Sequence, residues 1–336
     1  MAYTYSAQQR LYIKEQSGTG VPSTSFAASD ACAITSYDDN VVQDALTSND
    51  KDGTFSPVIG NLNAKTVNWS AVMDLRPSGT AGTAPDCNSL LKSLFGLETI
   101  NAGTSAVYTP HDSNEFYLSM LNAEGNASID YSMIWDAICS SVTWRLGEGL
   151  ATSEFSGQAV GYVSSKRFAI QSSEDKGRVT PLSSMPAIPG SATINGTPPQ
   201  ARQGSITIDG QTFSAFFRSG TITYSSGKGM DGPAWSSSLS RGIVRGRRSV
   251  AFDFSVVDTD TSEMTPILQK AESGTTVAIA IVAGSVAGLR CTWSMPKVRL
   301  NNPPKNYAES NRGRTISGLG YPSSTGALDE LTVTYS

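Results

Sequence analysis

In two stretches of the chain every second residue is apolar, which is the pattern of a strand with one buried face. In residues 66–75 the apolar side chains occupy the odd positions, and in residues 249–256 they occupy the even positions. Residues 276–283 (TVAIAIVA) are apolar but far too few to span a bilayer, and they mix β-branched with small side chains. We therefore predict two half-buried strands and one buried strand.

A short helical pattern follows each half-buried strand. Between residues 87 and 95 apolar side chains recur at spacings of three and four, and Gly96 is placed to end a helix. A briefer version occupies residues 266–271, with Gly274 beyond it. We predict one short helix in each half of the chain.

These signals occur in the same order in both halves, and the later segments also match. The Val-Thr-Trp-Arg-Leu segment that ends at Leu146 resembles Lys-Val-Arg-Leu ending at Leu300. Phe155-Ser-Gly resembles Ile316-Ser-Gly, and the Gly-Tyr pair that starts at Gly161 matches the one that starts at Gly320. Alignment of the two alternating strands places Asp74 over Asp253. Five matches in one order indicate a duplicated fold.

The predicted fold class is mainly β, with two tandem folds and one short flanking helix in each. The first fold covers residues 1–165 and the second covers residues 205–336. Residues 166–204 are rich in Ser, Pro and Gly and lack periodicity. They are interpreted as a linker or an arm across a neighbouring subunit, or else as a disordered loop.

Composition agrees with a strand-rich chain of two folds. The 336 residues exceed the usual size of one domain, and only 16% are charged, against about 25% in an average domain. Gly (31) and Pro (16) are plentiful, as many turns require. The four cysteines are far apart and form no Cys-x-x-Cys pair, so we expect buried thiols from a reducing cytoplasm. The first residues contain no apolar run, and a signal peptide is not expected.

The residue inventory argues against an enzyme. His111 is the single histidine, which leaves no histidine-based triad and no multi-histidine metal site. The aspartates between residues 38 and 52 lack the spacing of a calcium loop, and Gly227-Lys-Gly lacks the phosphate-loop context. We expect no catalytic activity, no cofactor and no metal. Trp69 and Trp144 fall on the apolar sides of predicted strands, so core positions are favoured over a carbohydrate-stacking surface.

One region carries a specific resemblance. Residues 75–85 (LRPSGTAGTAP), followed by Gly-Leu-Glu-Thr at 96–99 and AGTSAVYTP at 102–110, are similar to the major tail tube protein family of long-tailed bacteriophages, the siphophages. Residues 327–331 (ALDEL) resemble the closing segment of that family. The resemblance is specific between residues 70 and 110 and patchy elsewhere, where the polar loops depart from the family pattern.

The resemblance implies that the two folds are tail-tube-like β-sandwich or barrel folds, in a virion structural protein made in the host cytoplasm. Its rings would stack head to tail into a hollow, non-contractile tail tube for passage of the genome. Rings of this family present six such folds, so two folds per chain imply a trimer with pseudo-sixfold symmetry, while a hexamer of chains stays open. Implied partners are further copies of the chain, a tape measure protein, and tail terminator and tip proteins. Double-stranded DNA would pass transiently and without specificity, and no membrane is implied.

Charge divides unevenly between the halves. Residues 1–165 carry 17 acidic and 7 basic side chains, a net charge of −10, and residues 166–336 carry 12 and 18, a net of +6, which together give −4. The densest basic cluster is formed by Arg241, Arg245, Arg247 and Arg248. Tight phosphate binding would retain DNA in a conduit. We therefore expect these arginines to face carboxylates of an adjacent subunit or ring, with solvated surface charge as the alternative.

The candidate carboxylates for such inter-subunit or inter-ring contacts lie in one acidic segment: Asp38, Asp39, Asp44, Asp50 and Asp52. Exposed ion pairs contribute only about 0–1 kcal/mol each, so they would set register and orientation more than strength.

The polar faces of the two alternating strands are candidates for the channel lining. Their residues are Thr66, Asn68, Ser70, Asp74, Ser249, Asp253 and Ser255. Hydroxyls, amides and a few carboxylates give phosphates no strong binding site, although either strand face fits an outward orientation equally well. Other functions that stay open are a tail terminator, a head decoration protein and a receptor-binding, lectin-like module.

Overall fold

The computed structural model describes residues 9–42, 66–125, 130–147, 149–170, 182–199, 204–212, 217–230, 242–257, 264–306 and 313–336. Antiparallel strands dominate these ranges, so the mainly-β prediction is confirmed. The helices are η2 (Ala28–Asp30), α1 (Asn88–Phe95), α2 (Ser165–Ile170) and α4 (Met264–Ser273).

In the first half the strands form two layers. The outer layer pairs β2 (Ala31–Cys32) with β1 (Arg10–Glu15), then β7 (Leu118–Glu124), β8 (Asp130–Leu146) and β10 (Gly161–Ser164). The inner layer pairs β3 (Ser36–Val42) with β4 (Thr66–Asp74), then β9 (Thr152–Ala159) and again β8. A register shift between Cys139 and Ser141 divides β8. Because a bulge bends a strand, β8 can serve both layers.

The second half repeats this pairing order. Its outer layer pairs β12 (Gln211–Thr212) with β11 (Ser205–Ile208), then β17 (Val277–Ala283), β18 (Cys291–Leu300) and β21 (Thr332–Tyr335). Its inner layer pairs β13 (Phe217–Ser225) with β16 (Ser249–Val257), then β20 (Gly313–Tyr321), which is flanked by the end of β18 and by β19 (Lys305–Asn306).

Two hairpins add to this repeated scheme. The hairpin of β5 (Gly96–Asn101) and β6 (Ser105–Pro110) pairs with β21 through β6. The hairpin of β14 (Lys228–Met230) and β15 (Ile243–Arg245) connects β13 to β16. Each hairpin belongs to one half and contacts the other, so the two halves are interlocked.

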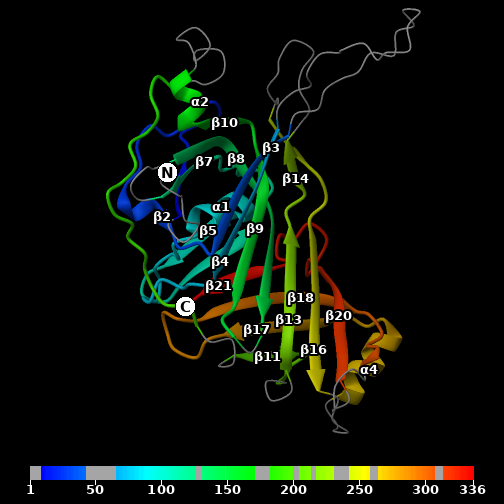
Figure 1. Ribbon diagram of the computed structural model, residues 1–336. Helices are drawn as coiled ribbons and strands as arrows, with labels where there is room; N and C mark the ends of the chain where they lie inside the picture. The colour runs from blue at the N-terminus through cyan, green and yellow to red at the C-terminus, as the bar shows by residue number, and fades with distance from the viewer. Residues whose placement is uncertain are drawn as a thin grey trace, which may run out of the picture.

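The inner layers of both halves join into one sheet, because β13 pairs with the second part of β8. The resulting strand order is β3-β4-β9-β8-β13-β16-β20. Figure 1 shows β9, β13, β16 and β20 side by side, with β17 and β18 crossing beside them. The fold therefore presents one broad sheet surface that spans both halves.

Local predictions from hydrophobic spacing are confirmed. Helix α1 buries Leu90, Leu91, Leu94 and Phe95 and ends at Gly96 in a left-handed conformation (φ 90°). The predicted apolar run is strand β17, with one face in the core. The cysteines are all buried free thiols, and Trp69 and Trp144 are core residues.

Two glycines define how the halves correspond. Gly157 lies opposite Trp69, and Gly318 lies opposite Phe252. A Cβ atom on either glycine would lie within 3 Å of the facing ring. If Gly157 corresponds to Gly318, as the predicted match of the two Ser-Gly segments has it, then Trp69 and Phe252 occupy equivalent positions in the two halves.

The alignment of Asp74 with Asp253 is wrong in register. Asp253 lies opposite Ser317, as Ser70 lies opposite Ser156, so Asp253 corresponds to Ser70. Alternation repeats every two residues and fits equally well after any even shift, so it could not fix the register.

The match between Leu146 and Leu300 is wrong for the same reason. Leu300 lies opposite Gly318, whereas the residue opposite Gly157 is Cys139. The strand position equivalent to the end of β8 is therefore β19 and not the end of β18.

Residues 166–170 of the predicted linker belong to helix α2, and its longer described part, residues 182–199, lies along the first half of its own chain. The Thr193 backbone N–H donates to the Ala28 carbonyl at 2.8 Å, and Arg76 Nη1 donates to the Gly196 carbonyl at 3.0 Å. Leu182 is buried in a small apolar cluster with Tyr12 and Trp135. This segment therefore covers the outer layer of the first half.

Candidate functional surfaces

One polar surface runs across the joined inner sheet. Strand registers place Ser70, Ser156, Ser141, Ser225 and Ser249 in one row that crosses five strands. Directly opposed residues of antiparallel strands share a face. All seven candidate channel residues lie on this same face, which we call the polar face: Thr66, Asn68, Ser70, Asp74, Ser249, Asp253 and Ser255.

Burial follows the same division. On β4 and β16 the residues that alternate with the polar ones are buried, including Trp69 and Phe252. Asn68, Ser249 and Asp253 are exposed, and Ser70 is half-buried. The apolar side of the sheet thus packs into the core, and the polar face is left to contact solvent or a partner.

Hydroxyl groups on the polar face bond to one another across strands. The Ser141 and Ser156 hydroxyls lie 2.7 Å apart, and the Thr143 and Thr223 hydroxyls lie 3.3 Å apart. The second pair bridges β8 and β13, where the two halves meet. Because these hydroxyl groups already hydrogen-bond to one another within the sheet, fewer of their donors and acceptors are left to bind a ligand.

Carboxylates outnumber cations on the polar face. Arg145 is one cation on this face and pairs with Glu154 at 2.9 Å. Lys297 and Arg299, at the end of β18, are two more, because they lie opposite Tyr321 and Leu319 of β20. The remaining charged residues of β3, β4 and β16 on this face are Asp38, Asp74 and Asp253. The β3, β4 and β16 part of the polar face therefore carries carboxylates and no cation, so it repels phosphate groups there.

The aspartates of the acidic segment divide between the two sides of β3. Asp38 is exposed on the polar face opposite Ser70. Asp39 lies on the other side and accepts a 2.7 Å hydrogen bond from Ser132 Oγ. Burial is the main cause that raises the pKa of Asp39. Asp44, Asp50 and Asp52 lie outside the described residues.

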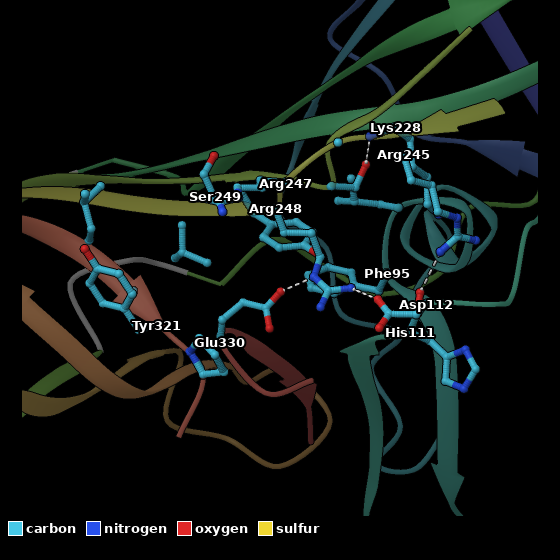
Figure 2. Close-up of a pocket in the computed structure, with 18 of the residues that line it drawn as sticks. Phe95, His111, Asp112, Lys228, Arg245, Arg247, Arg248, Ser249, Tyr321 and Glu330 are labelled. Atoms are coloured by element: carbon cyan, nitrogen blue, oxygen red, sulfur yellow. Dashed lines mark hydrogen bonds and ion pairs between the residues drawn. The ribbon is translucent and has the colours of Figure 1, made fainter. Parts of the chain in front are cut away.

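The arginine cluster lies where the two halves meet, beside an open pocket of about 790 Å³. Arg248 lies between Glu330 and Asp112 and makes an ion pair with each (Figure 2). Arg245 pairs with Glu115 at 3.1 Å and also donates to the backbone carbonyls of His111 and Asn114. These carboxylates belong to the same chain, so both side chains fasten the second half to the first.

The other two arginines of the cluster differ from this pair. Arg247 is exposed and lines the same pocket, and within the described residues it makes no hydrogen bond or ion pair. Arg241 lies outside the described residues. Arg247 is therefore the described member of the cluster with a charge left for another molecule.

Lys228 is a buried cation that spacing alone did not single out. It is 7% exposed, and its ammonium group donates to the Ser93 carbonyl near the end of α1. Burial lowers the pKa of Lys228 to about 8, with the nearby Arg245 charge adding to the effect. The flanking Gly227 and Gly229 were visible in the sequence, but the partner on a distant helix was not.

Metal-binding clusters and membrane-spanning helices are absent from the described ranges. No group of three or more His, Cys, Asp or Glu side chains is placed to hold a metal ion there. No described helix is both long and apolar enough to cross a membrane.

Comparison with known proteins gives one finding. A family model described as "Phage tail tube protein" matches residues 6–320. None of the curated proteins compared with the chain matches it.

Proposed function

Because the chain belongs to the phage tail tube protein family, we propose that it assembles into stacked rings that form the hollow tail tube, and that the phage genome passes through this tube. The observation that carries the proposal is the polar face, which continues without a break across both halves of the chain. A conduit needs a wide, smooth surface of this kind on its inside.

The polar face has the chemistry that a DNA channel requires. Phosphate binding gains affinity from each cation that replaces counterions. The face presents hydroxyls and amides, and its charged residues on β3, β4 and β16 are carboxylates, represented by Asp74 and Asp253. DNA would be kept from the wall and would slide without specific retention. We place Thr66, Asn68, Ser70 and Ser249 in this lining with Ser255.

Each ring contains three chains in this proposal. The support is the recurrence of one strand-pairing order in both halves, so that one chain supplies two folds. Three chains then present six folds with pseudo-sixfold symmetry. A closed ring also leaves no sheet edge open to uncontrolled pairing.

Contacts between subunits or stacked rings are assigned to the remaining charges. Arg245 and Arg248 are already paired inside the chain. Arg247 is exposed and unpaired within the described residues, so it is the arginine that we assign to an aspartate of a neighbouring copy. Arg241, Asp44, Asp50 and Asp52 join it as candidates from the sequence. Partners at the tube ends and inside it would be terminator, tip and tape measure proteins of a non-contractile tail.

Negative-stain electron microscopy of the purified chain tests the proposal. We expect hollow cylinders, or rings that stack into cylinders as concentration rises, with threefold symmetry in end views. Only dispersed monomers at every concentration would contradict a tube protein, and single rings that never stack would favour a terminator.

A further inference from the structure

The strand pairing that joins the two halves of the chain suggests how two chains could pair. Within the chain, β13 adds to the first-half inner sheet by pairing with the end of β8, and Ile222 lies opposite Trp144. Both side chains are fully buried. If each half is one copy of the same fold, the first half also has a strand equivalent to β13, and the second half has one equivalent to the end of β8.

The strand equivalent to β13 is β3. Ile222 lies opposite Phe252, and Asp39 lies opposite Trp69. Phe252 and Trp69 each face the glycine that marks the same position in its half, namely Gly318 and Gly157. Asp39 therefore holds the place of Ile222.

The strand equivalent to the end of β8 is β19. Trp144 lies opposite Ser153, four residues before Gly157, and Lys305 lies opposite Arg314, four residues before Gly318. Lys305 therefore holds the place of Trp144. The apolar pair of Ile222 and Trp144 inside the chain thus corresponds to Asp39 on β3 and Lys305 on β19.

Both of these strands have an open edge. Among the described residues β3 pairs with β4 alone, and β19 pairs with β20 alone. The Gln9 side chain bonds to both the N–H and the carbonyl of Tyr37, so these groups point away from β4. Backbone groups of alternate residues share a direction in an antiparallel strand. Those of Asp39 therefore also point to the open edge.

The backbone of Lys305 points outward by the same reasoning. The Thr315 N–H donates to the Pro304 carbonyl, so Pro304 faces β20 and its neighbour Lys305 faces away. Proline is tolerated in edge strands, and its missing N–H here lies on the side of β20. Within the described residues, Asp39 and Lys305 thus present unpaired backbone groups at opposite ends of the joined sheet.

We infer that β3 of one chain pairs antiparallel with β19 of the next, with Asp39 opposite Lys305. This inference rests on the ring proposed above and names the surface that closes it. Charges on an open edge protect an unassembled chain from random strand pairing, and opposite charges on facing strands stabilise the chosen register. Three such joints would carry the inner sheet around the whole ring.

A charge exchange tests the pairing. Asp39→Lys or Lys305→Asp alone places like charges opposite each other, and we expect loss of tubes in the electron microscope. The double variant with both changes restores opposite charges and should restore tubes. Glu272→Lys reverses an exposed charge on α4, outside the proposed joint, and is the control that should leave assembly intact. Tube loss in that control, or no rescue in the double variant, would overturn the inference.

A designed disulfide tests the register even if a charge variant folds poorly. The register places Asp38 opposite Asn306 in a non-hydrogen-bonded pair, where Cα atoms lie about 4.5 Å apart, within reach of a disulfide. Asp38→Cys with Asn306→Cys should give covalent species that end at three chains on a non-reducing gel. The native cysteines are buried and should not interfere.

The control for this gel is Asp38→Cys with Pro304→Cys, which is displaced by two residues, about 7 Å along the strand. It should give monomers. Tubes that form normally without the Asp38–Asn306 crosslink, or with the displaced crosslink instead, would overturn the inference and leave the tube function standing. Absence of tubes from the unmodified chain would instead count against the proposed function.

Discussion

Trp144 and Trp293 meet edge to face in the protein core, with ring centroids 5.8 Å apart and ring planes at 66°. Trp144 belongs to the first half of the chain and Trp293 to the second, and both are fully buried. Phe95 and Tyr224 make a second contact between the halves, stacked at 4.7 Å. The two folds therefore share one hydrophobic core and should unfold together.

Substitution of Trp144 tests this shared core. Trp144→Ala should lower the free energy of unfolding by about 3–5 kcal/mol, because it removes a large buried ring and leaves a cavity. Chemical denaturation followed by circular dichroism should show one transition for both proteins. Trp144→Phe keeps part of the packing and should cost less. Two separate transitions, with only one of them shifted by Trp144→Ala, would contradict a common core.

Gly157 should tolerate no side chain. A Cβ atom there would lie 1.9 Å from the Ile138 carbonyl oxygen and 2.7 Å from the Trp69 ring. Gly157→Ala should therefore destabilise the fold by about 1–3 kcal/mol or more, as overpacking does. Gly149 has open space around its Cβ position and serves as the control. Equal thermal stability of the Gly157→Ala and Gly149→Ala variants would show that this close approach does not exist.

The arginines Arg248 and Arg247 should separate into two roles. Arg248→Met leaves the buried Glu330 carboxylate without its cation and should cost about 3 kcal/mol of unfolding free energy. Arg247→Met removes an exposed charge and should change stability by less than about 0.5 kcal/mol. Urea denaturation of both variants gives the comparison. A larger loss of unfolding free energy for Arg247→Met than for Arg248→Met would contradict this assignment of roles.

The buried Lys228 predicts a specific dependence of stability on pH. Its pKa is about 8 in the folded chain and near its usual, higher value in the unfolded chain. Below pH 8 Lys228 is protonated in both the folded and the unfolded chain, so it does not make the unfolding free energy depend on pH. Above pH 8 the unfolded state binds more protons than the folded state, and stability rises with pH.

Comparison with Lys228→Met isolates this effect. From about pH 7 to about pH 9, which is within about 1 unit of that pKa, the unfolding free energy of the unmodified chain should increase relative to the variant. The upper limit is about 1.4 kcal/mol per pH unit. A constant difference between the two proteins across this range would mean that Lys228 keeps an ordinary pKa.

Local features of the fold could be predicted from the sequence, because they depend on neighbouring residues. Alternation in residues 66–75 predicts β4 and its buried face, and three-and-four spacing before Gly96 predicts α1. The division of polar from buried residues on β16 follows in the same way. These patterns were also sufficient to collect every candidate channel residue on one face.

Long-range relations could not be predicted by the same means. Glu115 lies 130 residues from its partner Arg245 in the chain, and Asp112 lies 136 residues from its partner Arg248. The local spacing of residues carries no information about such distant pairs. The register between β4 and β16 was missed because alternation is unchanged by even shifts. The pairing of β8 with β13 left no local signal at all.

The most direct test of the tube account is a cryo-electron microscopy reconstruction of the assembled protein, with the symmetry and the lumen wall read from the map. We predict three chains per ring and a channel wall formed by the polar face, with Ser70 and Asp253 exposed to the lumen. A tube whose channel is lined by the outer layer of β7 and β17, with the polar face turned outward, would contradict the account.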